Sequence, residues 1–159
     1  MTHSRSTFTR IALVAALMTG LTSLAVAPAG ASTLSPRARM YRATNNSRLN
    51  HEIRRVDIQD RISKLARQHS IKMANTGEYG KIFHTSHSVI EGTYLKGVNW
   101  STWGENVGVT GGSIGDLQQA FMQSYDHRRN ILNKSFRRVA VGTYRDDSGL
   151  LWVTVFFYG

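Results

Sequence analysis

The chain contains no cysteine, only two prolines, and only 10 acidic residues against 20 basic ones in a length of 159 residues. The absence of cysteine excludes disulfide bonds, a thiol nucleophile and lipid attachment to an N-terminal cysteine. Any fold must therefore be held by its hydrophobic core without covalent cross-links. Because acidic residues are few, a carboxylate among apolar neighbours is notable, since such a group must be paired or serve a function.

An apolar segment near the N-terminus has the layout of a secretory signal peptide. Arg5 and Arg10 precede an apolar run over residues 11–26, and a pattern of small residues then ends at Ala31. We predict that residues 1–31 are a signal peptide, that cleavage follows the last of them, and that the protein is secreted. An uncleaved membrane anchor is the alternative, but polar residues and glycine interrupt a run that is already short for spanning.

The charge of the chain points to anionic partners. The net charge is +10, and the signal segment holds only two of the basic residues and no acidic one, so the secreted part is strongly basic. A basic surface attracts polyanions. Outside the cell we expect these to be an anionic cell-envelope polymer or lipid headgroups, and not nucleic acid. The alternative is that the charge serves solubility alone.

The part that follows the signal segment is long enough for one domain. We place this domain at residues 40–159, after a polar lead-in at residues 32–39. Helices are predicted over residues 40–50 and 60–74, and the second of these has a clear apolar face. A third amphipathic helix is predicted over residues 113–124, where a serine and an aspartate three positions later form a capping box.

The rest of the domain divides into a loop and a hairpin. Residues 76–99 have mixed composition and four glycines, which predicts a long structured loop. Apolar alternation over residues 139–144, a polar turn, and an apolar run over residues 150–158 predict a β-hairpin. The second run is apolar at nearly every position, so we expect a central strand covered on both faces. The predicted fold class is α+β.

Three side chains are candidates for a functional site: His84 in "FHTS", Glu105 in "WGENVGV" and His127 in "SYDHR". All three are predicted to lie in loops or at the ends of elements, where functional side chains are common. Two imidazoles and a carboxylate suffice for an open zinc site, and equally for acid–base chemistry at neutral pH. Their spacing is not local, so the sequence pattern leaves open whether they meet. His69, on the apolar face of a helix, is predicted to be a hydrogen-bonded core residue.

The order of several segments resembles the CAP superfamily of cysteine-rich secretory, antigen 5 and pathogenesis-related 1 proteins. More narrowly, it resembles the bacterial secreted SCP-like proteins. The resemblance covers residues 40–158 and implies an α-β-α sandwich with a central antiparallel sheet and a large surface cleft. The segments that carry it are "TNNSRLN", "LARQHSIKMA", "FHTS", "WGENVGV", "FMQSYDHRRNIL" and "FRRVAVGTYRDDSGLLWVTVFFYG".

On matching positions, the resemblance implies roles for individual residues. His84, Glu105 and His127 would point into the cleft, and the two histidines would correspond to those that bind zinc in some members. Asn106 would tie its loop down through its amide. Arg128 adjoins the last histidine and would either hold an anionic headgroup at the cleft or stand in solvent.

Two departures from the family pattern bear on the implied site. Many animal and plant members carry a second glutamate that corresponds here to Ser124 or Gln123. The family's usual "SPGHR" is "SYDHR" in this chain, which removes Pro and Gly from the loop and adds Asp126 beside the histidine.

Three functions follow as hypotheses. The first is a non-catalytic cleft protein that binds zinc or another divalent cation through His84 and His127 and engages an envelope component or lipid. The second is a hydrolase in which Glu105 acts as general base on a metal-bound water. The third is a basic module that adheres to anionic cell-wall polymer through Arg54, Arg55, Arg128, Arg129, Arg137 and Arg138.

Under each of these hypotheses, we expect a monomer that is not inserted in a membrane after cleavage of the signal peptide.

Overall fold

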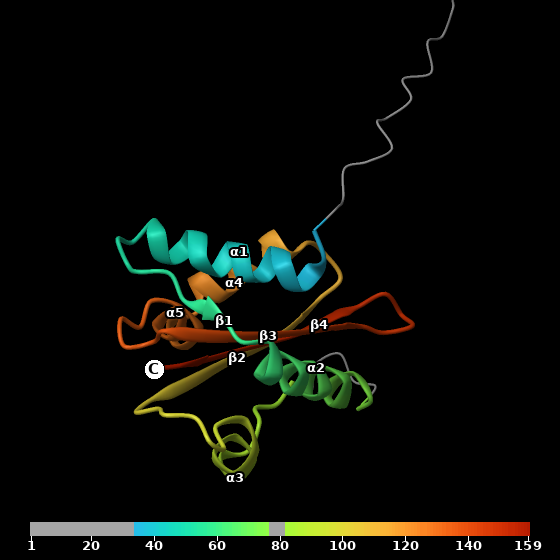
Figure 1. The fold of residues 1–159 in the computed structure, drawn as a ribbon. Coiled ribbons are helices and arrows are strands. Elements are labelled where there is room, and N and C mark those ends of the chain that lie inside the picture. Colours follow the sequence, from blue (N-terminus) through green and yellow to red (C-terminus); the bar gives the residue numbers. More distant parts are fainter. Residues whose placement is uncertain (1–33, 77–81) are drawn as a thin grey trace, which may run out of the picture. The chain divides into compact units, whose positions relative to one another are not determined.

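The computed structural model describes residues 34–76 and 82–159 (Figure 1). The predicted signal peptide, residues 1–31, lies outside the described residues. Among the described residues, no helix combines the length and the apolar character needed to cross a membrane.

A four-stranded sheet forms the middle of the domain. The strands are β1 (Asp57–Ile58), β2 (Trp103–Thr110), β3 (Arg138–Arg145) and β4 (Leu151–Tyr158), in the order β1-β3-β4-β2. The three long strands are antiparallel, as expected, whereas the short β1 runs parallel to β3 and makes the sheet mixed. The predicted hairpin is confirmed as β3 and β4. All eight residues of β4 are buried, which confirms a central strand covered on both faces.

Helices cover both faces of this sheet, which confirms the α-β-α sandwich (Figure 1). On one side lie α1 (Pro36–Leu49), α4 (Ile114–Gln123) and α5 (Tyr125–Ile131). On the other side lie α2 (Asp60–Ala74), the short α3 (His87–Val89) and a π-helical turn, η1 (Ile90–Tyr94).

The predicted helix boundaries are right for α2 and α4 and wrong for α1. Helix α4 begins at the capping box of Ser113 and Asp116 that the sequence indicates. Helix α1 begins four residues earlier than expected, at Pro36, because the Ser35 hydroxyl accepts a hydrogen bond from Ala38 N and proline suits the first helical position. The supposed lead-in therefore contributes its last four residues to the helix.

Three further elements, α3, η1 and β2, were not expected from the sequence. The segment 76–99 is not only a loop, because α3 and η1 lie within it and bury Ile90 and Tyr94 against the sheet. The "WGENVGV" segment is a strand rather than a loop. Its glycines admit close neighbours: a Cβ at Gly108 would lie 3.0 Å from side-chain atoms of Leu117 and Phe121. Glycines that suggest a loop in the sequence are thus positions of close packing in a strand.

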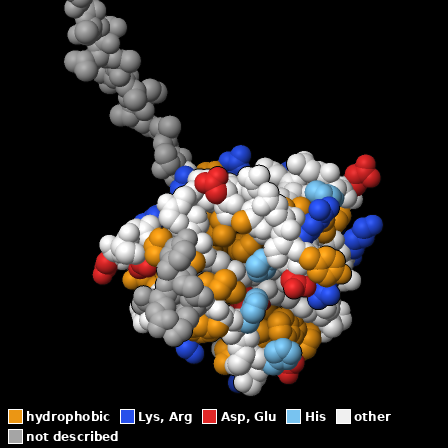
Figure 2. All heavy atoms as spheres, turned by 180° about the vertical axis from the view of Figure 1, so that it is seen from behind, with side chains coloured by type: hydrophobic (Ala, Val, Ile, Leu, Met, Phe, Trp, Pro, Cys, Tyr) orange, Lys and Arg blue, Asp and Glu red, His pale blue; other side chains and the backbone are white. Residues whose placement is uncertain are grey.

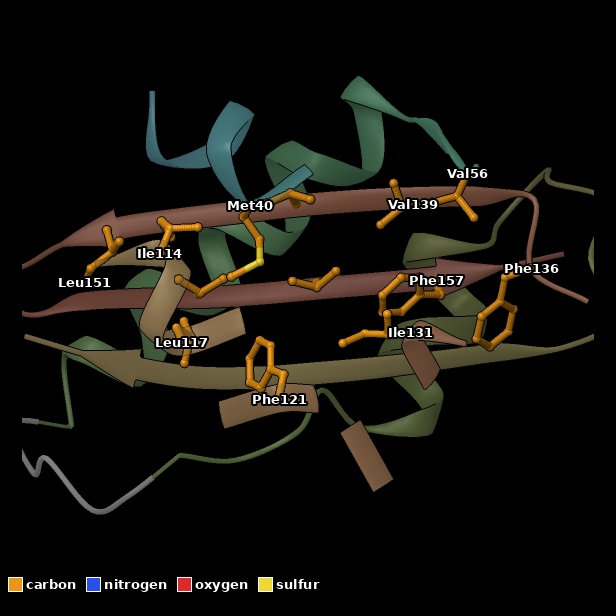
Figure 3. Close-up of a cluster of buried hydrophobic side chains, with 13 residues drawn as sticks. Met40, Val56, Ile114, Leu117, Phe121, Ile131, Phe136, Val139, Leu151 and Phe157 are labelled. Atoms are coloured by element: carbon orange, nitrogen blue, oxygen red, sulfur yellow. The ribbon is translucent and has the colours of Figure 1, made fainter. Parts of the chain in front are cut away.

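The core follows the two-residue period of the strands. Odd-numbered residues of β3 and β4, such as Val141 and Val155, pack with α1, α4 and α5 in the cluster of Figure 3. Even-numbered residues, such as Ala140 and Phe156, pack with α2 and η1 in a second cluster. Helix α2 approaches closely, since a Cβ on Gly142 would lie 2.1 Å from the Ala66 carbonyl carbon. One sheet therefore separates two hydrophobic layers.

Arg48 is fully buried at the end of α1 and joins three parts of the chain. Its Nε donates to the Arg54 carbonyl at 2.8 Å, and its Nη1 donates to the carbonyls of Ile131 at 2.7 Å and Asn133 at 2.9 Å. Its Nη2 donates to the Phe136 carbonyl at 3.4 Å. Burial, followed by the charge of a neighbouring arginine, lowers the pKa of this guanidinium. Backbone carbonyls stand in for a counterion and fix the C-terminal end of α5.

Replacing Arg48 with methionine should destabilise the fold by at least about 3 kcal/mol, because four hydrogen bonds to backbone carbonyls are lost, two of them buried. Urea unfolding followed by circular dichroism measures the change. The matched control is Arg42→Met on the exposed side of the same helix, which we expect to change the free energy of unfolding by no more than about 0.5 kcal/mol. Equal stability of the two variants would contradict the stabilising role of the Arg48 hydrogen bonds.

Candidate functional site

The carboxylate of Glu105 is buried on β2 and is fully paired. Its side chain is 1% exposed. One oxygen, Oε2, accepts hydrogen bonds from His84 Nδ1 at 3.0 Å and from the backbone N–H of Thr85 at 2.8 Å. The other oxygen, Oε1, accepts the Thr85 hydroxyl at 2.7 Å. Glu105 therefore anchors the "FHTS" segment to the sheet.

These contacts shift the pKa values of both partners. Burial alone would raise the pKa of the Glu105 carboxyl, but the hydrogen bonds from His84 and Thr85 outweigh it and leave this pKa below its ordinary value. The hydrogen bond to Glu105 raises the pKa of His84. The pair therefore favours an ionised carboxylate next to an imidazole whose Nδ1 carries a proton, which leaves Nε2 of His84 facing away from the carboxylate.

His127 is held in place through its backbone and its ring. The Asn106 amide donates to the His127 carbonyl at 2.9 Å, so this asparagine ties α5 to β2. The Asn130 side chain donates in turn to Asn106 Oδ1 at 2.9 Å. The His127 ring packs against Phe121, with 4.8 Å between the ring centroids. Burial, followed by the positive charge of His84, lowers the pKa of His127.

A hollow of about 510 Å³ brings the candidate residues together. His84, Glu105, Ser124 and His127 all line it. Figure 2 shows histidine side chains gathered on this face of the molecule, among hydrophobic and acidic side chains. The hollow opens along the outer edge of β2, where the two helix layers meet.

Two of the predicted cleft residues do not line this hollow. Asn106 is fully buried and supports α5 from within. Arg128 points elsewhere and donates to His51 Nε2 at 3.4 Å, while the next residue, Arg129, takes the position at the hollow. Arg128 and Arg129 point in different directions because they are consecutive residues of a helix, α5, which was not expected from the sequence.

The sequence analysis predicted that Glu105 and His127 lie in loops or at the ends of elements, and this was wrong. Glu105 lies within strand β2 and His127 within helix α5. Thr85 was missed, although it directly follows His84 in the quoted motif and binds both oxygens of the carboxylate. Trp103 and Asp126 also line the hollow. His69 is confirmed as a core residue, because it is 7% exposed and its Nε2 lies 2.8 Å from the Phe83 carbonyl.

Three imidazoles line this hollow, those of His84, His87 and His127. Among residues 34–76 and 82–159, no group of three His, Asp or Glu side chains is placed to hold a metal ion. Glu105 is committed to His84 and Thr85, so it supports a ligand from behind instead of acting as one. A carboxylate behind the Nδ1 of a histidine is the usual support of a metal-binding imidazole. An ion held by two of the histidines would need solvent or a bound ligand to complete its coordination.

A serine in the segment "GGSIG" has the spacing of a nucleophile elbow, but its surroundings do not match that role. The Ser113 hydroxyl accepts from Asp116 N and donates to the Asp116 carboxylate, which makes it the N-cap of α4. The residue is exposed and lies outside the lining of the histidine hollow.

Comparison with known proteins gives the family. Residues 41–157 match the model of the cysteine-rich secretory protein family, CAP, so the chain belongs to this family. The Bacillus subtilis protein YkwD is 29% identical over 113 residues, which are 71% of this chain and 43% of YkwD. The chain thus spans less than half of that relative.

Solved structures show the same fold. An extracellular SCP-domain protein from Bacillus anthracis aligns with a TM-score of 0.63 and 24% identity, over 77% of this chain and 40% of that one. An outer surface protein of Borrelia burgdorferi aligns with a TM-score of 0.65 and 15% identity, over 77% of this chain and 91% of that one. These two proteins are described as an extracellular and an outer surface protein, and their likeness to this chain shows the fold.

The two histidines should titrate on opposite sides of the ordinary histidine pKa, His84 above it and His127 below it. Glu105→Gln should lower the pKa of His84, because the negative charge is lost and a hydrogen bond to a neutral amide oxygen is weaker, while burial remains. His84→Ala should raise the pKa of His127 by removing a nearby positive charge. Ring resonances followed by NMR across pH measure both values.

The matched control for this titration is Glu91→Gln, which removes an exposed carboxylate from η1 and should leave the His84 pKa unchanged. A Glu105→Gln variant that is folded and yet keeps the His84 pKa of the wild type would contradict the pairing.

Proposed function

We propose that this protein is a secreted, non-catalytic CAP-domain protein whose hollow binds a divalent cation through His84 and His127. Through that cation it would engage an envelope component or a lipid. The observation that carries the proposal is the placement of His84 and His127, from opposite sides of the sheet, in one hollow, with a buried carboxylate behind His84.

The two imidazoles differ in their electrostatics: the raised pKa of His84 means that a cation must displace a proton from that ring, whereas the lowered pKa of His127 favours a neutral ring. Metal ligation requires a histidine nitrogen without a proton. His84 has its Nδ1 occupied by Glu105, which orients the ring so that Nε2 is the donor to a metal. The lowered pKa of His127 keeps that ring neutral at physiological pH. When bound, a zinc ion would supply positive charge and open coordination positions for ligand oxygens.

The alternative hydrolase function is not favoured by the geometry. A general base must come within hydrogen-bond reach of the water it activates. The Glu105 side chain is 1% exposed, and both of its oxygens already accept hydrogen bonds from His84 and Thr85. Its pKa is lowered, which also weakens it as a base.

General adhesion through the six arginines named above is supported only by their exposure. Five of them are exposed, while Arg138 is half-buried and forms an ion pair with Asp57. Exposure alone does not define a ligand.

Calorimetric titration of the purified protein with zinc at pH 7.5 tests the proposal. We expect binding by the wild type and at least a tenfold loss of affinity in the His84→Ala, His127→Ala double variant. Glu105→Gln should weaken binding by about tenfold or more, because the supporting carboxylate is lost. Lowering the pH to 5 should also weaken binding, since protonated imidazoles cannot ligate a metal.

The matched control is His51→Ala, which removes an exposed histidine outside the hollow and should leave zinc affinity unchanged. Equal heats for the wild type and the folded double variant would eliminate the metal part of the proposal.

Secretion is tested separately by expressing the full chain in a bacterial host that exports proteins. We expect the protein in the medium, with a mass that corresponds to a chain beginning at Ser32. Recovery of only the uncleaved chain in the membrane fraction would overturn the proposed localisation.

A further inference from the structure

A second hollow of about 510 Å³ lies at the opposite edge of the sheet, along β3. The short β1 pairs only with Arg138 and Val139, so beyond that point the outer edge of β3 has no strand partner among the described residues. This hollow shares no lining residue with the histidine hollow. Its walls come from α1, α2 and β3, and they consist of Arg37, Asp60, Ser63, Lys64, Arg67, Val141 and Thr143.

The hollow carries an excess of positive charge. The only acidic residue in its lining is Asp60, and Arg37 neutralises it in an ion pair that bridges α1 and α2. Lys64 and Arg67 have no carboxylate partner within residues 34–76 and 82–159. Two cations without a carboxylate partner in the described part of the chain therefore border a concave surface, which is the arrangement that attracts an anion.

Two of the side chains around this hollow, Arg67 and Arg37, are held in place by other contacts. The Arg67 guanidinium lies 5.8 Å from the centre of the Tyr144 ring, a distance that allows a cation–π contact. Arg37 also donates to Ser63 Oγ at 3.3 Å. That hydroxyl accepts the backbone N–H of Val141 at 3.0 Å and so fixes α2 to the edge of β3. Preorganised donors lose less entropy when they bind a ligand.

Thr143 supplies further donors on the floor of the hollow. The backbone N–H of Val141 points to the open edge of β3, where it donates to Ser63. Because alternate residues of a strand direct their N–H groups to the same side, the N–H of Thr143 points to this edge as well. The Thr143 hydroxyl lies in the lining and makes no hydrogen bond with any other described residue. A backbone N–H, a hydroxyl, an ammonium and a guanidinium thus border the same space.

We propose that this hollow binds a phosphate group through Lys64, Arg67 and Thr143, with Arg37 at one end. A tetrahedral phosphate accepts several charge-assisted hydrogen bonds at once, and guanidinium, ammonium, hydroxyl and backbone donors are its usual partners. The phosphate belongs to a polyol-phosphate envelope polymer or to a phospholipid headgroup, which share this chemistry. The site is independent of the histidine hollow and does not rest on the proposed metal binding.

The test compares two double variants that remove the same charge. Lys64→Gln, Arg67→Gln alters the site, while Arg54→Gln, Arg55→Gln removes two exposed arginines elsewhere. The probes are inorganic phosphate and a short glycerol-phosphate oligomer, titrated by NMR at physiological salt, and phosphatidylglycerol vesicles in a sedimentation assay. In at least one arm we expect the first variant to lose tenfold or more in affinity, and the control to lose less than twofold.

Thr143→Val keeps the size of the side chain and removes its hydroxyl, and we expect an affinity loss of about threefold in the arm that binds. Binding by the oligomer alone identifies an envelope polymer as the source, whereas binding by vesicles alone identifies a lipid headgroup. Equal losses in both double variants would show attraction by net charge alone and overturn the proposal, as would no binding to any probe.

A further variant separates this site from the metal site. The His84→Ala, His127→Ala protein should bind phosphate with the wild-type affinity. Loss of phosphate binding in that folded variant would place the phosphate in the histidine hollow and overturn the assignment to the edge of β3.

Discussion

The buried carboxylate of Glu105 is the constraint on which the arrangement of the site depends. A carboxylate that is removed from water must be compensated, and here His84 and Thr85 compensate it. The next residue, Asn106, faces the other side of the sheet and binds the backbone of His127. Because consecutive strand residues point to opposite faces, two neighbours on β2 fix one histidine from each helix layer. The edge of β2 is where both layers can meet.

Arg48 gives α5 a second attachment. The guanidinium is as deeply buried as Asn106 and is compensated by carbonyl groups, including that of Ile131 at the end of α5. The short helix is therefore held near its beginning through the His127 carbonyl and at its end through Arg48. A helix of seven residues has little stability of its own, so these buried polar contacts and the packing of Ile131 determine where His127 lies.

The two edges of the sheet have different chemistry. The edge at β2 combines histidines with a buried carboxylate, while the edge at β3 combines cations with an unpaired strand edge. Membership of the CAP family and the likeness to extracellular relatives define the fold and not the ligand, because one fold hosts many functions. The ligands must therefore be argued from these two sites separately.

The sequence by itself determined the parts of the fold that rest on local pattern. The period of α2, the capping box at Ser113 and the apolar run of β4 each carry their signal within a few residues. It did not determine β2, η1 or α5, because the glycines and polar residues of these elements make their contacts with residues that are distant in the chain. The tertiary structure alone decided that Glu105 is buried, that Thr85 satisfies it, and that Arg129 rather than Arg128 faces the hollow. These features depend on hydrogen bonds and packing between residues some twenty positions apart, which no local sequence pattern indicates.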